Sequence, residues 1–169
     1  DSGVATINAQ TNIAGIYGRF SIDTNGAWIY TLNNNAVNVQ GLTSAQNATD
    51  SFTISALDGT SRVIALTVAG TNDAPVIVSN APAISYADTT ADDSFTAATY
   101  VASATDAEGD PLVWTIQSAG GITNSLAGAY GTLNVIGNTF SYTPNDVAIE
   151  ALKSNARDGF TLQVTDGSV

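Results

Sequence analysis

The feature of this sequence that most restricts its fold is an internal repeat. Three segments occur twice, in the same order and about 110 residues apart. The pairs are residues 15–22 with 128–135, residues 28–31 with 140–143, and residues 50–59 with 158–167. A repeat of this length is expected to be one structural module, so the chain is predicted to contain two modules in tandem.

Alternation of apolar and polar residues predicts short strands in both copies, separated by turn-forming pairs such as Asn25-Gly26 and Asp58-Gly59. The side chains expected to face inward are Phe20, Ile22, Trp28, Tyr30, Leu32, Phe52, Ile54, Ala56, Ile64, Leu66 and Val68 in the first copy, and Leu133, Val135, Phe140, Tyr142, Phe160, Leu162 and Val164 in the second. Short strands at this spacing are typical of a β-sandwich, so we predict an all-β fold.

One stretch departs from the strand pattern. In residues 144–153, Pro144 stands near the start, acidic residues follow it, and Lys153 stands at the end. These are start and stop signals of a helix, so we predict a short helix that crosses between the sheets.

Residues 72–75 (NDAP) are expected to form a linker, because proline fixes the backbone and favours an extended, stiff joint. The first module is therefore placed in residues 1–73 and the second in residues 74–169. The ends of the sequence are out of phase with the repeat, so we expect the opening strands of the first module and the last strand of the second to be missing. An open strand edge of this kind invites pairing with another chain. Because the sequence begins at Asp1 without a signal peptide, we interpret it as an excised fragment.

Composition excludes several classes of function. A net charge of -11 leaves no basic patch that could neutralise the phosphates of nucleic acid or an anionic membrane. The absence of cysteine and histidine excludes disulfides, thiolate metal sites and the usual acyl-transfer triads. Clustered carboxylates instead favour hard divalent cations. No apolar run is long enough to span a membrane, so membrane insertion is not expected.

Several segments of the first module together resemble the VCBS repeat, which occurs in very large secreted bacterial proteins. They are residues 17–18 (YG), 23–32 (DTNGAWIYTL), 49–53 (TDSFT), 58–60 (DGT) and 70–76 (GTNDAPV). The second module, with residues 104–112 (ATDAEGDPL), resembles the bacterial cadherin-like repeats of the same proteins. It departs from the VCBS pattern at Pro144 and the helical insert.

The resemblance implies two tandem immunoglobulin-like (Ig-like) or cadherin-like β-sandwiches, of the kind that are strung end to end in adhesins and biofilm-matrix proteins exported by type I secretion. It also implies calcium at the junctions between modules, where the ion stiffens the array. Some cadherin-like modules of this kind bind extracellular polysaccharide.

Asp106, Glu108 and Asp110 are the strongest candidates for metal ligands. Three carboxylates at alternate positions, with Gly109 between them, can curl around one calcium ion, which takes about six to eight oxygen ligands. The alternative is a solvated turn without an ion, because Asp and Gly are favoured in turns in any case.

The resemblance to cadherin-type junctions makes Asn72 and Asp73 of the linker the expected partners of this loop. Asp92 or Asp93 is a further candidate ligand, and the sequence does not choose between them. With calcium as the cofactor, neutralising the clustered carboxylates is expected to stabilise the fold.

The aromatic residues allow a second interpretation, a platform on which sugars stack. Trp28, Tyr30, Phe140 and Tyr142 alternate with small polar residues, however, which favours positions in a sandwich core. The less regularly placed aromatic residues are better candidates for exposed positions: Tyr86, Tyr100 and Trp114.

Enzymatic function is not expected, because the acidic residues lie mainly in turns and the linker, with no sign of a desolvated cleft. We predict a calcium-dependent structural or adhesive module of an extracellular bacterial surface or biofilm-matrix adhesin. Its expected partners are neighbouring repeats of the parent chain and an extracellular polysaccharide or host-surface ligand. The alternative is a calcium-dependent lectin module that binds extracellular polysaccharide.

Overall fold

The structure is a computed structural model that describes residues 6–79 and 81–168. The chain divides into two compact units, Asp1–Asp73 and Ala74–Val169, and each unit is described by itself. The all-β prediction is confirmed, because strands in several sheets make up the fold and the described helices are short, with four and five residues.

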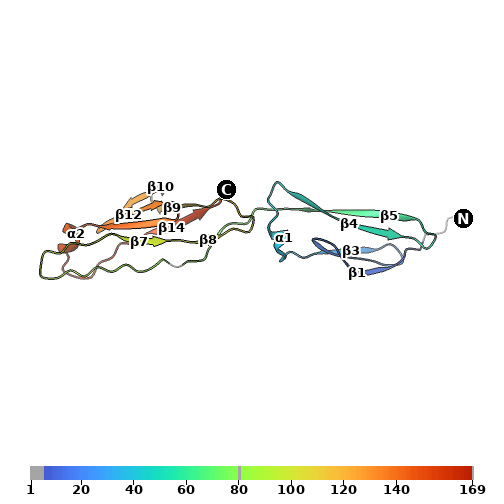
Figure 1. Cartoon of the computed structure of the whole chain (residues 1–169), viewed down its shortest axis with the longest axis horizontal. Coiled ribbons are helices and arrows are strands. Elements are labelled where there is room, and N and C mark those ends of the chain that lie inside the picture. The colour runs from blue at the N-terminus through green and yellow to red at the C-terminus, as the bar shows by residue number, and fades with distance from the viewer. Residues whose placement is uncertain (1–5, 80, 169) are drawn as a thin grey trace. The chain divides into compact units, whose positions relative to one another are not determined.

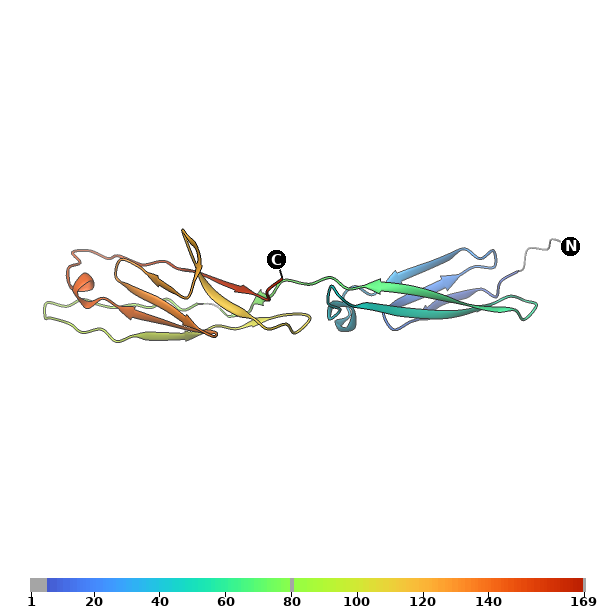
Figure 2. The ribbon, with the colours of Figure 1, turned by 90° about the horizontal axis from the view of Figure 1, so that it is seen from above.

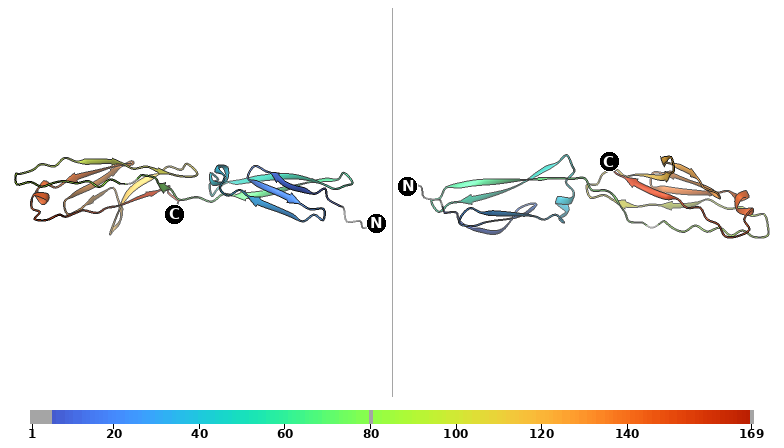
Figure 3. Two further views of the ribbon diagram at one scale, coloured as in Figure 1. Left: turned by 90° about the horizontal axis from the view of Figure 1, so that it is seen from below. Right: turned by 180° about the vertical axis from the view of Figure 1, so that it is seen from behind.

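The first unit consists of two antiparallel sheets that lie as two layers (Figure 3, right). Its elements are β1 (Gln10–Ala14), β2 (Gly18–Ile22), β3 (Trp28–Leu32), α1 (Val37–Gln40), β4 (Asn47–Ser55) and β5 (Ser61–Ala69). The first three strands form one sheet in the order β1–β2–β3, and β4 and β5 form a hairpin in which all nine residues of each strand are paired. The chain crosses from one sheet to the other through α1, a helix that the sequence analysis did not predict.

The core of the first unit lies between these two layers. Phe20 and Ile22 of β2 and Phe52 of β4 are buried, and the rings of Phe20 and Phe52 stack with their centroids 4.7 Å apart. The prediction that Trp28 and Leu32 are buried is wrong, because these side chains are 48% and 37% exposed. The reason is that β3 is an edge strand of its sheet, so the inward face is only partly covered there.

The second unit contains a larger set of strands (Figure 1). Its elements are β6 (Val76–Ile77), β7 (Ala98–Val101), β8 (Ala104–Thr105), β9 (Val113–Ser118), β10 (Gly121–Thr123), β11 (Ser125–Ala127), β12 (Gly131–Ile136), β13 (Thr139–Pro144), α2 (Asp146–Glu150) and β14 (Thr161–Thr165). One sheet has the order β11–β12–β13–β7 and a second has the order β10–β9–β14, while β6 and β8 form a separate short pair. All neighbouring strands in these sheets are antiparallel.

The core of the second unit is formed by side chains that both sheets contribute. Its buried members are Ala102, Trp114, Ile116, Leu133, Val135, Phe140 and Tyr142. The rings of Trp114 and Phe140 meet edge to face with their centroids 5.9 Å apart, which joins β9 to β13. The predicted inward positions of Leu133, Phe140 and Tyr142 are therefore confirmed.

The short helix expected within residues 144–153 is confirmed as α2. Its N-cap is Asn145, whose side-chain oxygen accepts a hydrogen bond from the backbone N–H of Ala148. Ile149 is the buried residue of the helix. Figures 1 and 2 both show α2 at the end of the second unit that lies opposite β8.

Candidate functional site

The loop that follows β8 holds the predicted metal ligands Asp106, Glu108 and Asp110, and all three side chains are half-buried. Asp106 Oδ1 accepts a hydrogen bond from the backbone N–H of Asp110 at 2.9 Å, which closes the loop. Gly109 adopts a φ of 79°, a left-handed conformation that glycine tolerates far better than other residues. The sequence thus folds locally into a tight turn that carries three carboxylates.

The second carboxylate oxygen of Asp106 is the observation that points to a ligand in this loop. Asp106 Oδ2 is buried and has no hydrogen-bond partner. A buried polar atom of this kind costs free energy, and a carboxylate oxygen costs more, because nothing replaces the water it has lost. The residues fit a calcium ion, since Ca²⁺ binds carboxylate oxygens and would satisfy this atom.

Asn72 and Asp73, the partners expected from the resemblance, end the first unit. The side-chain amide of Asn72 donates a hydrogen bond to the backbone carbonyl of Asp73 at 3.1 Å. The loop with Asp106 belongs to the second unit. It therefore stays a prediction that Asn72 and Asp73 bind the same ion as the Asp106 loop.

Asp93, one of the two further candidates, lies in a different part of the second unit. Its backbone N–H donates to Glu150 Oε1 of α2 at 3.1 Å, and its Oδ2 accepts from the backbone N–H of Thr89 at 2.7 Å. Because α2 lies at the end opposite β8 (Figures 1 and 2), the structure separates Asp93 from the Asp106 loop.

Asp88, Asp93 and Glu150 form an acidic cluster that the sequence analysis missed, with carboxylate oxygens within 4.8 Å of one another. Partial desolvation raises the pKa of Glu150, the charges of Asp88 and Asp93 add to this effect, and the Asp93 N–H opposes it. No spacing signal could have found the cluster, because Glu150 is distant in sequence. Exposed acidic groups of this kind are common without an ion, so we assign no site to it.

A buried carboxylate organises the first unit. Asp50 is only 1% exposed. Its oxygens accept hydrogen bonds from the backbone N–H groups of Ile16, Tyr17 and Gly18 at 2.6, 3.1 and 3.1 Å. The hydroxyl of Tyr30 donates a fourth bond at 2.6 Å. This Asp50 clamp fixes the turn between β1 and β2 to the β4 strand of the opposite sheet.

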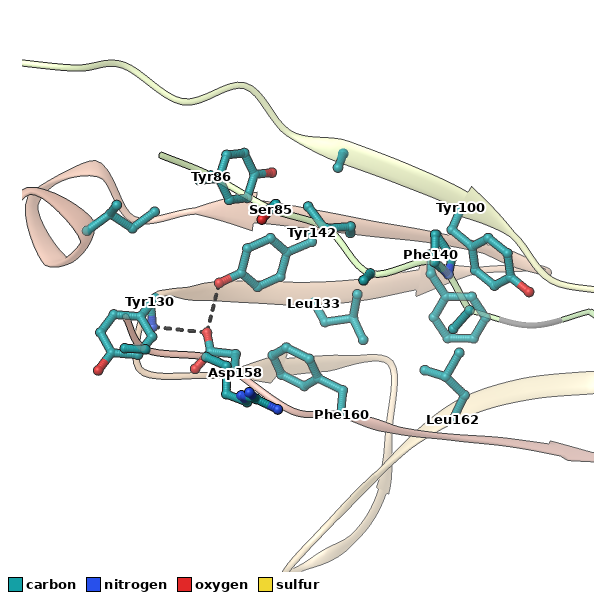
Figure 4. A pocket seen from close by; sticks show the side chains of 18 of the residues that line it. Ser85, Tyr86, Tyr100, Tyr130, Leu133, Phe140, Tyr142, Asp158, Phe160 and Leu162 are labelled. Carbon is teal, nitrogen blue, oxygen red and sulfur yellow. Dashed lines mark hydrogen bonds between the residues drawn. The ribbon is translucent and has the colours of Figure 1, made fainter. Parts of the chain in front are cut away.

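The second unit repeats the arrangement at the corresponding positions. Asp158 accepts hydrogen bonds from the backbone N–H groups of Ala129 and Tyr130 at 2.8 and 3.0 Å and from the hydroxyl of Tyr142 at 2.8 Å. Figure 4 shows this Asp158 clamp: the hydroxyl of Tyr142 and the backbone N–H of Tyr130 are directed at the carboxylate, and the ring of Tyr130 points away from it. The two clamps use the residues that the internal repeat aligns.

Both clamps require glycine beside the carboxylate. A Cβ atom on Gly15 would overlap the Asp50 carboxylate, and one on Gly128 would overlap the Asp158 carboxylate. Without side chains, these residues let the backbone approach the carboxylate closely. The repeated Gly-x-Tyr-Gly sequence is the signal for the clamp, although the sequence alone does not show that a carboxylate lies beside it.

The electrostatics of the Asp50 clamp fit a structural role. Burial opposes ionisation of Asp50, but the hydrogen bonds from Tyr30 and the backbone amides outweigh burial and lower the pKa of the carboxyl group. Burial, followed by the hydrogen bond and the charge of Asp50, raises the pKa of Tyr30. A stable carboxylate beside a phenol that resists ionisation is the opposite of the tuning that general acid–base catalysis requires.

The aromatic side chains predicted to be exposed lie closer to the core than expected. The prediction for Trp114 is wrong, because its side chain is only 7% exposed, packed in the core under β13. Tyr86 and Tyr100 are half-buried against the same core, and their hydroxyls bond to Thr96 O and Ser79 Oγ at 2.9 and 2.6 Å.

The fold and the clamps define a class of protein: an all-β module built from packed antiparallel sheets and held by polar clamps at Asp50 and Asp158. A family model for the bacterial Ig domain matches residues 72–169, more than half of the chain. The chain therefore belongs to the bacterial Ig domain family, whose members are generally non-enzymatic structural modules. No curated protein matches the chain. In the described part of the chain, no helix has the length and apolarity needed to span a membrane.

Proposed function

We propose that this chain is a secreted structural and adhesive piece of a bacterial cell-surface or biofilm-matrix adhesin. Membership of the bacterial Ig domain family supports the structural and adhesive role. The net charge of -11 agrees with an extracellular module that projects from a surface and does not bind nucleic acid. Neighbouring repeats of the parent chain are its proposed partners.

The first unit is proposed to be a second Ig-like module, of the VCBS type, in tandem with the family-matched one. Support comes from the two clamps, because Asp50 with Tyr30 and Asp158 with Tyr142 make the same bonds. A shared clamp at aligned positions is expected of two copies of one ancestral module.

Calcium is proposed to set the rigidity of the module, and the buried, unpartnered Asp106 Oδ2 is the observation that carries this proposal. Asp106, Glu108 and Asp110 would hold the ion, with Asn72 and Asp73 as further ligands. The ion would supply positive charge to clustered carboxylates, which otherwise repel one another. The loop would then resist opening.

Titration calorimetry tests the calcium proposal on the full chain after chelation. We expect saturable heat of Ca²⁺ binding that is lost in both Asp106→Ala and Asp110→Ala. Asp92→Ala is the matched control, because Asp92 is an exposed acid of the same unit and is adjacent to Asp93, which the structure separates from the Asp106 loop. Absence of binding by the wild-type chain, or equal loss in the control, would remove the ion from this loop.

Calcium-dependent polysaccharide binding is a second candidate function, and the exposed ring of Trp28 favours it. Trp28 is 48% exposed, so part of its face is available for stacking on a sugar. Glycan and exopolysaccharide binding with and without calcium, compared between wild type and Trp28→Ala, separates the two functions. A passive spacer binds no glycan in either state.

A further inference from the structure

The second unit has an open groove on the outer face of its four-stranded sheet. Its volume is about 640 Å³. Thr132, Asn134 and Thr143 line it, together with residues 144–147, which lead from β13 into α2. The three side chains point outward, because their neighbours along β12 and β13 belong to the core. Since α2 lies at the end of the unit opposite β8, the groove is separate from the Asp106 loop (Figures 1 and 2).

The sheet that carries this groove is uncharged. The strands β7, β11, β12 and β13 contain no acidic or basic residue, although the chain has a net charge of -11. On the outer face, Thr132 lies opposite Thr143, and Asn134 lies opposite Ser141. In the part of the chain that the structure describes, the side chains of Thr132, Asn134 and Thr143 make no hydrogen bond to another protein group. Their hydroxyl and amide groups are therefore available as donors and acceptors.

The first unit shows that the fold does not require this composition. Through the internal repeat, Thr132 aligns with Arg19 and Ser141 aligns with Ile29. The pairs of strands that bear these residues have the same register in both units, and Arg19 and Ile29 are exposed. Charged and apolar side chains are thus compatible with these positions, and the uncharged polar lining is a property of the second unit.

The lining restricts the chemistry of an occupant. Among the described residues that line the groove, Asp146 is the one carboxylate, and its Oδ1 accepts a hydrogen bond from the backbone N–H of Phe95 at 3.3 Å. One carboxylate does not supply the oxygen ligands of a metal ion, and an anion finds no basic side chain there. An added β-strand is excluded, because β12 is already paired on both sides, with β11 and β13.

We propose that this groove binds a neutral polysaccharide and that this binding does not need calcium. Sugar hydroxyls both donate and accept hydrogen bonds, which matches the hydroxyls of Thr132 and Thr143 and the amide of Asn134. Val147, which is 80% exposed, offers an apolar contact for the face of a sugar ring. The proposal rests on the second candidate function, polysaccharide binding, and gives it a site in the second unit that is distinct from Trp28 of the first.

NMR titration of the full chain in chelator tests the proposal, with neutral hexasaccharides of glucose, mannose and galactose as probes. We expect saturable shifts of the backbone amides of residues 131–134 and 143–147, and of the side-chain amide of Asn134. Asn134→Ala should weaken binding about three- to tenfold, because it removes the hydrogen bonds of one side chain. Hexagalacturonate, an anionic hexasaccharide, should bind more weakly than the neutral sugars.

Thr132→Arg is the stronger variant, because Arg19 at the aligned position shows that the paired strand accepts this side chain. It fills the groove and should abolish binding of the neutral sugars. Thr161→Arg is the matched control. Thr161 is an exposed threonine of β14 in the other sheet and does not line the groove, so this substitution should leave binding unchanged.

The outcomes separate the groove from the function on which it rests. If Trp28→Ala abolishes glycan binding while Asn134→Ala and Thr132→Arg do not weaken it, the chain binds polysaccharide elsewhere and the groove is the wrong site. Binding that chelator removes, or equal binding of hexagalacturonate, would overturn the proposed calcium-independent, neutral specificity. If no sugar binds with or without calcium, both the groove and the second candidate function are wrong.

Discussion

At the scale of single residues, the Asp50 and Asp158 clamps perform the same structural task in the two units. Each carboxylate joins a glycine-containing turn, a tyrosine hydroxyl and the strand or segment that bears the carboxylate. Hydrogen bonds to an ionised group are stronger than those between neutral groups. A clamp therefore concentrates much of a small module's stability in one carboxylate.

Asp50→Asn should destabilise the first unit by about 3 kcal/mol, because the amide places its NH₂ group against donors that the carboxylate accepted. The indole N–H signals of Trp28 and Trp114 in NMR spectra report the first and second unit separately during urea unfolding. Asp158→Asn is the matched substitution and should affect the Trp114 signal instead. If one substitution changed the urea midpoints of both signals equally, the two clamps would not act separately.

The pH dependence of the Asp50 contribution has a definite sign. Its pKa is lowered in the folded state, so its contribution to the unfolding free energy is complete above the unfolded value of about 3.9. The contribution is lost as pH falls through the folded pKa. The difference in unfolding free energy between wild type and Asp50→Asn should therefore shrink as the pH falls below about 4. A difference that stays constant over this range would exclude the ionised carboxylate as its source.

Glycine at the clamp can be tested against glycine elsewhere in the same unit. A Cβ atom on Gly128 would overlap the Asp158 carboxylate, whereas one on Gly159 would meet no atom within 4 Å. Gly128→Ala should cost about 1–3 kcal/mol of unfolding free energy through overpacking. Gly159→Ala should be neutral or slightly stabilising, because it restricts the unfolded chain. Thermal unfolding of both variants checks the contrast.

At the scale of elements, pairing decides whether an alternating sequence becomes a strand. Residues 47–52 and 155–160 have aligned sequences, but only the first segment has a paired neighbour. We expect the backbone amides of 47–52 to exchange slowly with solvent and those of 155–160 to exchange quickly. Hydrogen exchange followed by NMR or mass spectrometry measures this, and similar protection of both segments would show that β14 extends toward Asp158.

The same comparison shows which features the sequence could predict. Alternation identified Phe20, Phe52 and Phe140 as core residues, and capping signals identified α2, because both depend on neighbours in the sequence. The exposure of Trp28 and the burial of Trp114 depend on which strands lie at sheet edges. Alternation within one strand carries no such information.

Only part of the candidate site could be predicted from the sequence, for the same reason. The alternating carboxylates around Gly109 in the sequence indicated Asp106 as a ligand. The structure adds the buried, unpartnered Oδ2 atom of that residue. The Asp50 clamp and the cluster at Glu150 bring together residues that are far apart in sequence. Such sites depend on tertiary packing, which a local pattern does not encode.

At the scale of the whole molecule, a net charge of -11 means that cations can stabilise the chain in two ways. General screening reduces repulsion among all the acids, whereas a bound ion acts only at its ligands. Screening and site-specific binding can be distinguished in about 0.15 M NaCl. The Debye length there is already about 8 Å, and millimolar calcium adds little ionic strength.

Under those conditions, chelator should lower the melting temperature of the second unit. An ion at a hundred times its dissociation constant contributes about 2.7 kcal/mol to the folded state. Asp106→Asn in calcium should melt like wild type in chelator, and magnesium should replace calcium poorly because it demands a smaller, octahedral site. Differential scanning calorimetry of the full chain makes the measurement. A melting temperature that responds equally to calcium, magnesium and added NaCl would assign the effect to screening, and the Asp106 loop would then be a solvated turn.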